Sequence, residues 1–171
     1  MNKSELNEYL RNVADLVKSI KSESAHTYKF KGCEDLVLQL GEFHRPKPLP
    51  TWLEKGRLQA CYANSFKLMT DHPATLTYVE GYACRAGLPL PVLHAWCIDR
   101  EGWVYDATWP YEKETIYRGI SFNRNFVLEC VLDTGGYSIL DNPMIAPKIF
   151  KGLIPSNEFL FHQVELKNQG S

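Results

Sequence analysis

A β-hairpin signal in residues 92–109 constrains this chain more than any other feature. The segment reads VLHAWCIDREGWVYDATW, and two runs rich in aromatic and β-branched residues flank the tripeptide REG. Such a tripeptide is typical of a three-residue hairpin loop, whose last residue adopts the left-handed backbone conformation that glycine tolerates. With Gly102 in that position, Asp99 pairs with Trp103, and this pairing sets the register of the whole hairpin.

The register places a histidine and an aspartate on the same face of the hairpin. His94 lies opposite Thr108 and Asp106 lies opposite Trp96, so His94 and Asp106 are diagonal neighbours whose side chains can meet. A register shifted by one residue would turn Asp106 to the other face. A histidine beside an aspartate is a base with an orienting partner, because the carboxylate accepts a hydrogen bond from one ring nitrogen and leaves the other free.

The remaining pattern predicts an α+β fold. Strands are expected over residues 75–84, 92–99, 103–109 and 115–122. Helices are expected over residues 4–22, from Gln59 or Ala60 to the residue before His72-Pro73, and over residues 123–133. We expect Ser4 to cap the first of these helices.

Two proline-rich segments connect these elements. Residues 41–56 contain three prolines and predict an extended, ordered loop. Residues 142–155 are expected to close over the sheet. The chain is therefore expected to form one domain over residues 1–171, with a helix packed on a mostly antiparallel sheet and further helices at the periphery.

Cys61 is the best candidate for a nucleophile, because it falls in the first turn of the helix expected from Gln59 or Ala60. The unpaired N–H groups and the dipole of a helix N-terminus favour a thiolate, and a neighbouring imidazolium favours it further. The amide of Gln59 and the backbone N–H of Cys61 can both donate to an oxyanion. The alternative is that Cys61 is a small buried hydrophobic residue and that Asp106 caps a turn.

Aromatic residues crowd the segments around these three polar candidates. The residues expected to contact substrate are Trp52, Tyr62, Trp96 and Trp109. Packing in the core and in the hairpin is the alternative interpretation of the same set. Trp96 lies two residues from His94 on the same face, and we expect it to shield the imidazole from water.

The other cysteines and histidines predict no second site. Packing roles are expected for Cys33, Cys84, Cys97 and Cys130. Surface positions are expected for His26, His44, His72 and His162. A zinc site made of Cys84, His94 and Cys97 is disfavoured, because strand alternation points His94 and Cys97 to opposite faces. The chemistry expected of Cys61 requires neither a metal nor a cofactor.

Charge and hydropathy argue against several classes of protein. The net charge of −1 offers no electrostatic basis for binding nucleic acid or an anionic membrane, and no apolar run is long enough to span a bilayer. The five cysteines are odd in number and form no CxxC pair, which is typical of a reducing compartment. We therefore expect a cytoplasmic protein, or one delivered into a host cytoplasm.

The candidate residues lie in segments that resemble a known superfamily. A cysteine on a helix, a strand histidine within HAW and a strand aspartate within VYDATW have the order and setting of the papain-like cysteine hydrolases. The segments QACYANS, YVEGYA, HAWCIDREGWVYDATW and YRGISF are similar to those of small bacterial and phage proteins of the transglutaminase-like branch, over about residues 57–122. The resemblance implies Cys61 as nucleophile, His94 as base and Asp106 as orienting residue. Gln59 departs from the papain pattern, in which the oxyanion glutamine lies further upstream.

The expected activity is cysteine-dependent acyl transfer on a protein or peptide amide. Cys61 attacks the carbonyl, His94 protonates the departing amine, and water or a second amine resolves the thioester. Water as acceptor makes the enzyme a peptidase, amidase or deamidase, and an amine makes it a transglutaminase. We favour hydrolysis because water is always available. The alternative is a non-catalytic papain-like scaffold that binds or inhibits a host or partner protein.

Overall fold

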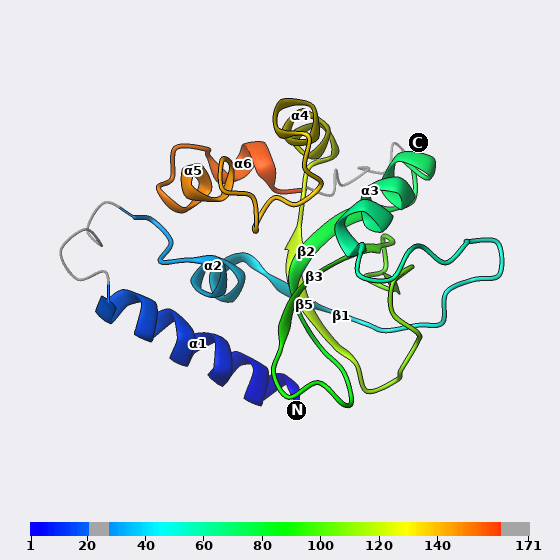
Figure 1. Ribbon diagram of the computed structural model, residues 1–171, viewed down its shortest axis with the longest axis horizontal. Coiled ribbons are helices and arrows are strands. Elements are labelled where there is room, and N and C mark those ends of the chain that lie inside the picture. Colours follow the sequence, from blue (N-terminus) through cyan, green and yellow to red (C-terminus); the bar gives the residue numbers. More distant parts are fainter. Residues whose placement is uncertain (21–27, 162–171) are drawn as a thin grey trace, which may run out of the picture.

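A curled, antiparallel, five-stranded sheet forms the centre of the molecule (Figure 1). The computed structural model describes residues 1–20 and 28–161, and its fold class is α+β, as predicted. The strands are β1 (Glu42–His44), β2 (Thr77–Cys84), β3 (Val92–Ile98), β4 (Val104–Tyr105) and β5 (Ile116–Ser121). Their order in the sheet is β1-β5-β2-β3-β4, and neighbouring strands are antiparallel.

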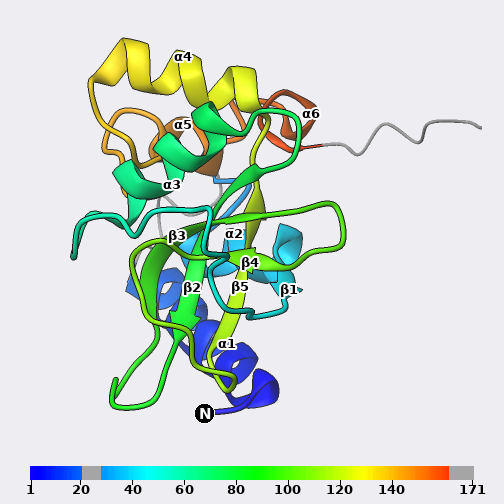
Figure 2. The same ribbon diagram turned by 90° about the vertical axis from the view of Figure 1, so that its right-hand side faces the viewer.

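Six helices of the described residues surround this sheet. They are α1 (Lys3–Ile20), α2 (Cys33–Leu40), α3 (Cys61–Asp71), α4 (Arg124–Thr134), α5 (Ala146–Phe150) and α6 (Ser156–Phe159). Helices α4, α5 and α6 gather at one end of the sheet, whereas α1 lies at the opposite end (Figures 1 and 2). Helix α3 packs against β3 and β2.

The two faces of the sheet have different neighbours. Side chains of the outer face, among them Tyr78, Cys97 and Ile120, join the main core with residues of the helices. Side chains of the inner face pack on one another inside the curl; they are Val79, Ala83, Trp96, Val104 and Tyr117. Because strand residues alternate between the faces, His94 shares the inner face with Trp96.

The sheet curls so far that its two edge strands meet. The backbone N–H of Arg45, directly after β1, donates to the carbonyl of Gly102 at 3.0 Å. The N–H of Val104 in β4 donates to the carbonyl of Arg45 at 2.8 Å, and Arg45 and Trp103 form a parallel bridge. The inner face is therefore enclosed in the manner of a small barrel.

The hairpin that joins β3 and β4 has the predicted loop and register. Gly102 adopts a φ of 77°, and the N–H of Asp99 donates to the carbonyl of Trp103 at 3.2 Å. The strands then pair Ile98 with Val104. Strand β4 ends at Tyr105, although we expected it to continue to residue 109, because the Asp106 carboxylate binds backbone N–H groups ahead of it and turns the chain.

Other boundaries differ from the prediction in particular places. Helix α1 is capped by Asn2, whose Oδ1 accepts the N–H groups of Ser4 and Glu5 at 2.9 and 3.0 Å, so the prediction that Ser4 is the cap was wrong. Helix α2 was not predicted. The segment 41–56 is not entirely loop, because Glu42–His44 pair with β5. The remaining predicted strands and helices of the described chain begin and end within two residues of the observed ones.

Gly119 gives the enclosed tryptophan its space. A Cβ at this position would lie 2.8 Å from two ring carbons of Trp96 and 2.7 Å from the carbonyl oxygen of Glu80. We expect Gly119→Ala to lower the free energy of unfolding by about 1–3 kcal/mol, because neither neighbour can move freely. Chemical denaturation with Gly136→Ala as control measures this, since a Cβ at Gly136 would meet its nearest atom only at 3.5 Å. Equal stability of the two variants would contradict the expected crowding.

Candidate active site

His94 and Asp106 form a buried pair on the inner face of the sheet. Nε2 of His94 lies 2.8 Å from Oδ2 of Asp106, and the residues are 2% and 8% exposed. Burial alone raises the pKa of Asp106, but hydrogen bonds and the charge of His94 outweigh it and hold the pKa below its ordinary value. The carboxylate is therefore ionised and accepts the bond, so Nε2 carries the hydrogen and Nδ1 remains for another partner.

Three further donors hold the Asp106 carboxylate in place. The Tyr117 hydroxyl donates to Oδ2 at 3.0 Å, and the N–H groups of Thr108 and Trp109 donate to Oδ1 at 2.8 and 3.0 Å. Burial and the nearby Asp106 charge raise the pKa of Tyr117, which keeps its hydroxyl protonated. The sequence analysis did not assign Tyr117 to the site, because it reaches Asp106 only through the pairing of β5 with β2.

Cys61 is the first residue of α3 and is half-buried. The first helical hydrogen bond runs from the N–H of Asn64 to the carbonyl of Ala60 at 2.9 Å, and Ala60 supplies no side-chain cap. Among the described residues, the three N–H groups before Asn64 have no hydrogen-bond partner, so they can face the sulfur or an incoming oxygen. Together with the helix dipole they favour negative charge at this position.

The imidazole of His94 interacts with both Asp106 and Cys61. Burial lowers the pKa of His94, but the hydrogen bonds and charges of Asp106 and Cys61 outweigh burial and raise the pKa to about 9. Strand β4 pairs with β3 only at Cys97 and Ile98, so β4 does not cover the edge of β3 at His94, and α3 packs against β3. The structure thus brings together the three residues that the sequence singled out as nucleophile, base and orienting residue.

Gln59 lies two residues before Cys61, just outside α3. Its side chain is exposed, and its backbone has a φ of 60°, which is uncommon for a residue other than glycine. Among the described residues no hydrogen bond ties its amide. The amide is therefore available near the start of the helix, where an oxyanion was expected to form.

Two of the four aromatic residues expected at the site lie against His94. The Trp109 ring stacks on the imidazole with 4.0 Å between centroids and 16° between planes. The Trp96 ring is 6.2 Å from it, and Trp96 has no exposed surface, so it shields His94 as expected but presents nothing for a substrate to touch. Trp109 is half-buried and also lines a cavity of about 340 Å³ beside Arg85–Leu88.

The other two aromatic residues lie away from the imidazole. Trp52 is 60% exposed and packs edge-on against His72 with 5.2 Å between centroids. It lines a separate cavity of about 370 Å³ at the far end of α3, together with Lys67 and Asp71. Tyr62 packs against the main core. The described contacts of Trp52 and Tyr62 therefore do not bring them to His94.

Asn64 joins the start of α3 to the loop that carries Asp106. Its Nδ2 donates to Thr108 Oγ1 and to the carbonyl of Arg57, both at 2.8 Å, and its Oδ1 accepts the N–H of Arg57 at 3.1 Å. The sequence analysis missed this residue. Its spacing of three from Cys61, on the same side of a helix, is the signal that points to it.

The remaining cysteines and histidines fall into three groups. Cys97 donates to the carbonyl of Ser65 and Cys33 to that of Leu140, both at 3.2 Å, while Cys84 and Cys130 are buried, so the packing roles are confirmed. His44 is only 5% exposed, so the predicted surface position was wrong, and His72 is half-buried against Trp52. His26 and His162 lie outside the described residues.

Comparisons with known proteins add no family to these observations. No protein-family model matches the sequence, and searches of curated proteins and of solved structures found no significant match. Within residues 1–20 and 28–161, no three histidine, cysteine or acidic side chains gather as a metal site would require. None of the helices in those ranges has the length and apolar character needed to cross a membrane. The geometry around Cys61 is therefore the basis for a functional proposal.

Proposed function

We propose that this chain is a cysteine-dependent acyl-transfer enzyme with a papain-like, transglutaminase-like arrangement of its catalytic residues. Cys61 is the nucleophile, His94 is the general base and acid, and Asp106 orients His94. The observation that carries the proposal is the imidazole itself, bound on one side to Asp106 at 2.8 Å and interacting on the other with Cys61 at a helix N-terminus.

The hydrogen bond to Asp106 determines which ring nitrogen does the chemistry. Because Nε2–H donates to the carboxylate, Nδ1 takes the thiol proton and the pair becomes a thiolate and an imidazolium. The sulfur attacks an amide carbonyl, a C–S bond forms, and the oxyanion accepts hydrogen bonds from N–H groups at the start of α3. Nδ1–H then protonates the amide nitrogen and the C–N bond breaks. The amine departs, and the acyl group remains on Cys61 as a thioester.

The thioester is resolved by an acceptor that His94 deprotonates. When the acceptor is water, a carboxylic acid leaves, the C–S bond breaks and the proton returns to the sulfur. We propose hydrolysis as the principal outcome, with a protein or peptide amide as substrate. The cavity beside Trp109 offers about 340 Å³ of space for part of a substrate, and its aromatic wall stacks on the imidazole.

Alkylation by iodoacetamide tests the proposed nucleophile. We expect Cys61 to react about tenfold or more faster than glutathione, because the neighbouring imidazole of His94 and the helix N-terminus both favour the nucleophilic form of the sulfur. His94→Ala should remove this advantage. Burial raises the pKa of Cys33 and Cys130 to about 12, so these thiols should remain unmodified in the folded protein. Intact-protein and peptide mass spectrometry follow the reaction.

A slow reaction at Cys61 would support the non-catalytic alternative. The site would then be a binding surface, and neither His94→Ala nor Asp106→Asn would alter the alkylation rate.

The substrate class is identified by incubating a lysate with the wild type or with Cys61→Ala and comparing peptides by mass spectrometry. Peptides cleaved or deamidated only by the wild type identify hydrolysis, and cross-linked peptides identify transfer to an amine.

A further inference from the structure

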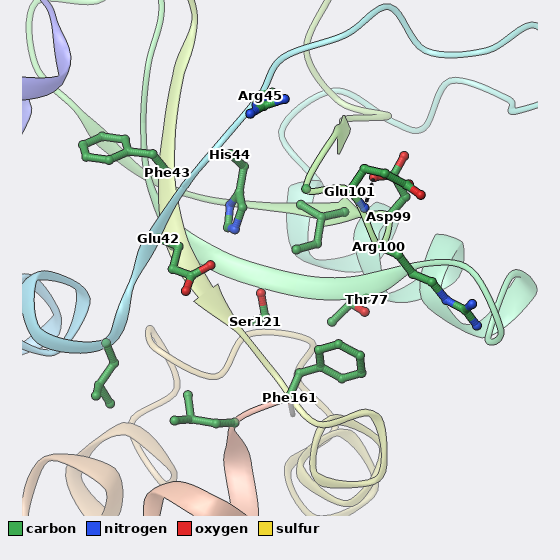
Figure 3. Close-up of a pocket in the computed structure, with 15 residues that line it drawn as sticks. Glu42, Phe43, His44, Arg45, Thr77, Asp99, Arg100, Glu101, Ser121 and Phe161 are labelled. Atoms are coloured by element: carbon green, nitrogen blue, oxygen red, sulfur yellow. Dashed lines mark hydrogen bonds between the residues drawn. The ribbon is translucent and has the colours of Figure 1, made fainter. Parts of the chain in front are cut away.

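A second cavity opens at the other end of the curled sheet, away from His94. It has a volume of about 520 Å³ and is lined from β1, from the ends of β2, β3 and β5 and from the loop after β3 (Figure 3). Thr77 and Ile98 pair at this end of the β2–β3 hairpin, whereas Ala83 and Val92 pair at the end nearer His94. The mouths of barrel-like sheets are common places for small-molecule sites.

One wall of this cavity carries a buried nitrogen without a partner. His44 is 5% exposed, and its Nδ1 lies 3.3 Å from the indole Nε1 of Trp96. An indole nitrogen can only donate, so Nδ1 accepts and the hydrogen of the neutral ring is on Nε2. Nε2 is buried and has no hydrogen-bond partner among residues 1–20 and 28–161. A buried donor without a partner is costly, so this N–H group indicates a position for an acceptor.

Burial also keeps the His44 ring uncharged. It lowers the pKa of His44 to about 4, so the ring is neutral at physiological pH and presents one N–H donor rather than a positive charge. Trp96, which holds the other ring nitrogen, is fully buried and packed beside Gly119. The ring therefore has a fixed orientation, and Nε2–H is its hydrogen-bonding group that lacks a partner in the described part of the chain.

A carboxylate lies beside this donor. Glu42 precedes His44 by two residues on β1, so both side chains lie on the same face of the strand. Figure 3 shows the Glu42 carboxylate and the Ser121 hydroxyl directed into the space below the His44 ring. Among the described residues no cation forms an ion pair with Glu42. Ile98 and Phe161 add apolar surface to the walls.

We propose that this cavity binds a small molecule with an amide-type edge, in which a carbonyl oxygen lies next to an N–H group. The oxygen accepts from Nε2–H of His44, and the N–H donates to the Glu42 carboxylate. A carboxylate ligand would satisfy His44 but would be repelled by Glu42. A purely apolar ligand would leave both groups without partners. The same edge is found in carboxamides and in nucleobases such as uracil.

Binding of matched probes to the full chain tests this proposal. Benzamide and uridine represent the two sources of the edge, and benzoate replaces the amide of benzamide by a carboxylate of the same shape. We expect benzamide or uridine to bind with a Kd of about 1 mM or lower, and benzoate at least about tenfold more weakly. NMR titration of the His44 side-chain resonances reports both the affinity and the position of the ligand.

Two exposed-residue variants separate the site from adventitious binding. Glu42→Gln should weaken the amide probe and let benzoate approach it in affinity, whereas the control Glu114→Gln, outside the cavity, should change neither. The proposal is overturned if no probe binds, if benzoate binds the wild type as well as benzamide does, or if Glu42→Gln behaves like the control. It does not depend on Cys61, so Cys61→Ala should bind the probes with unchanged affinity.

Discussion

Replacing Asp106 by asparagine is expected to lower amide turnover by about 10³- to 10⁴-fold while the protein stays folded. The two backbone N–H groups that bind Oδ1 require an acceptor, so they will hold the asparagine oxygen in that position. The side-chain NH2 then takes the place of Oδ2 and points a donor at His94. Nε2 must become an acceptor, the ring hydrogen moves to Nδ1, and Nδ1 can no longer take the proton of Cys61.

This effect has a readout that requires no substrate. The imidazole of His94 should titrate with a pKa of about 9 in the wild type. In Asp106→Asn the charge of the carboxylate and its hydrogen bond to the ring are gone, so the pKa should fall well below that of the wild type. NMR of labelled histidine measures both the pKa and the tautomer. An asparagine variant with the wild-type pKa or with turnover within tenfold of the wild type would contradict the role of Asp106.

Tyr117→Phe is the matched control for the Asp106 variant. It removes one hydrogen bond from Oδ2 but leaves the carboxylate charge and the bond to His94, so turnover should fall by only about tenfold.

The raised pKa of His94 also predicts the direction of the pH dependence. The protonated ring donates to the leaving amine, so turnover should decline as the pH rises through about 9. A decline already complete at pH 7 would be inconsistent with the paired imidazole.

Glu80→Ala is expected to lower the free energy of unfolding by about 3–5 kcal/mol, because it leaves the buried N–H groups of Ile139 and Leu140 unpaired and opens a cavity. Glu80 has no exposed surface. Its carboxylate accepts the N–H groups of Ile139 and Leu140 at 2.6 and 2.8 Å, and the Tyr78 hydroxyl lies 2.6 Å from Oε1. These bonds fasten the segment after α4 to β2. Denaturant unfolding followed by circular dichroism measures the change.

Glu80→Gln is the conservative comparison. Its amide oxygen can still accept from Ile139 and Tyr78, but the NH2 group faces the N–H of Leu140, so we expect a loss of about 1–2 kcal/mol.

Burial outweighs the hydrogen bonds and raises the pKa of Glu80 from 4.5 to about 7. The folded state therefore takes up a proton between these values, and the stabilisation is complete below pH 4.5 and lost as the pH rises through 7. Glu80→Gln should lose this slope.

The hairpin and the catalytic candidates were predictable because the signals that define them are local. The REG loop determines the pairing of Asp99 with Trp103, and alternation along each strand then brings His94 and Asp106 to one face. The start of α3 was also predictable, because the periodic pattern that follows Cys61 ends before a proline. These segments suffice to place the imidazole between its two expected partners.

Other parts depend on contacts between distant residues. Strand β1 has only three residues and lies within a proline-rich segment, so its sequence resembles that of a loop. It is a strand because it pairs with β5. For the same reason His44 was expected on the surface. Tyr117 reaches Asp106 from another strand. A short strand or a long-range hydrogen bond leaves little periodicity in the sequence, and tertiary pairing decides its place.

The contact between Arg45 and β4 has a consequence for the behaviour of this protein at high concentration. An open sheet presents two rows of unsatisfied peptide groups on which strands of other molecules can align. Here the ends of β1 and β4 bond to one another, so the short exposed margins offer little template for such growth. Loosening this junction would therefore expose the margins of β1 and β4 and favour intermolecular strand addition.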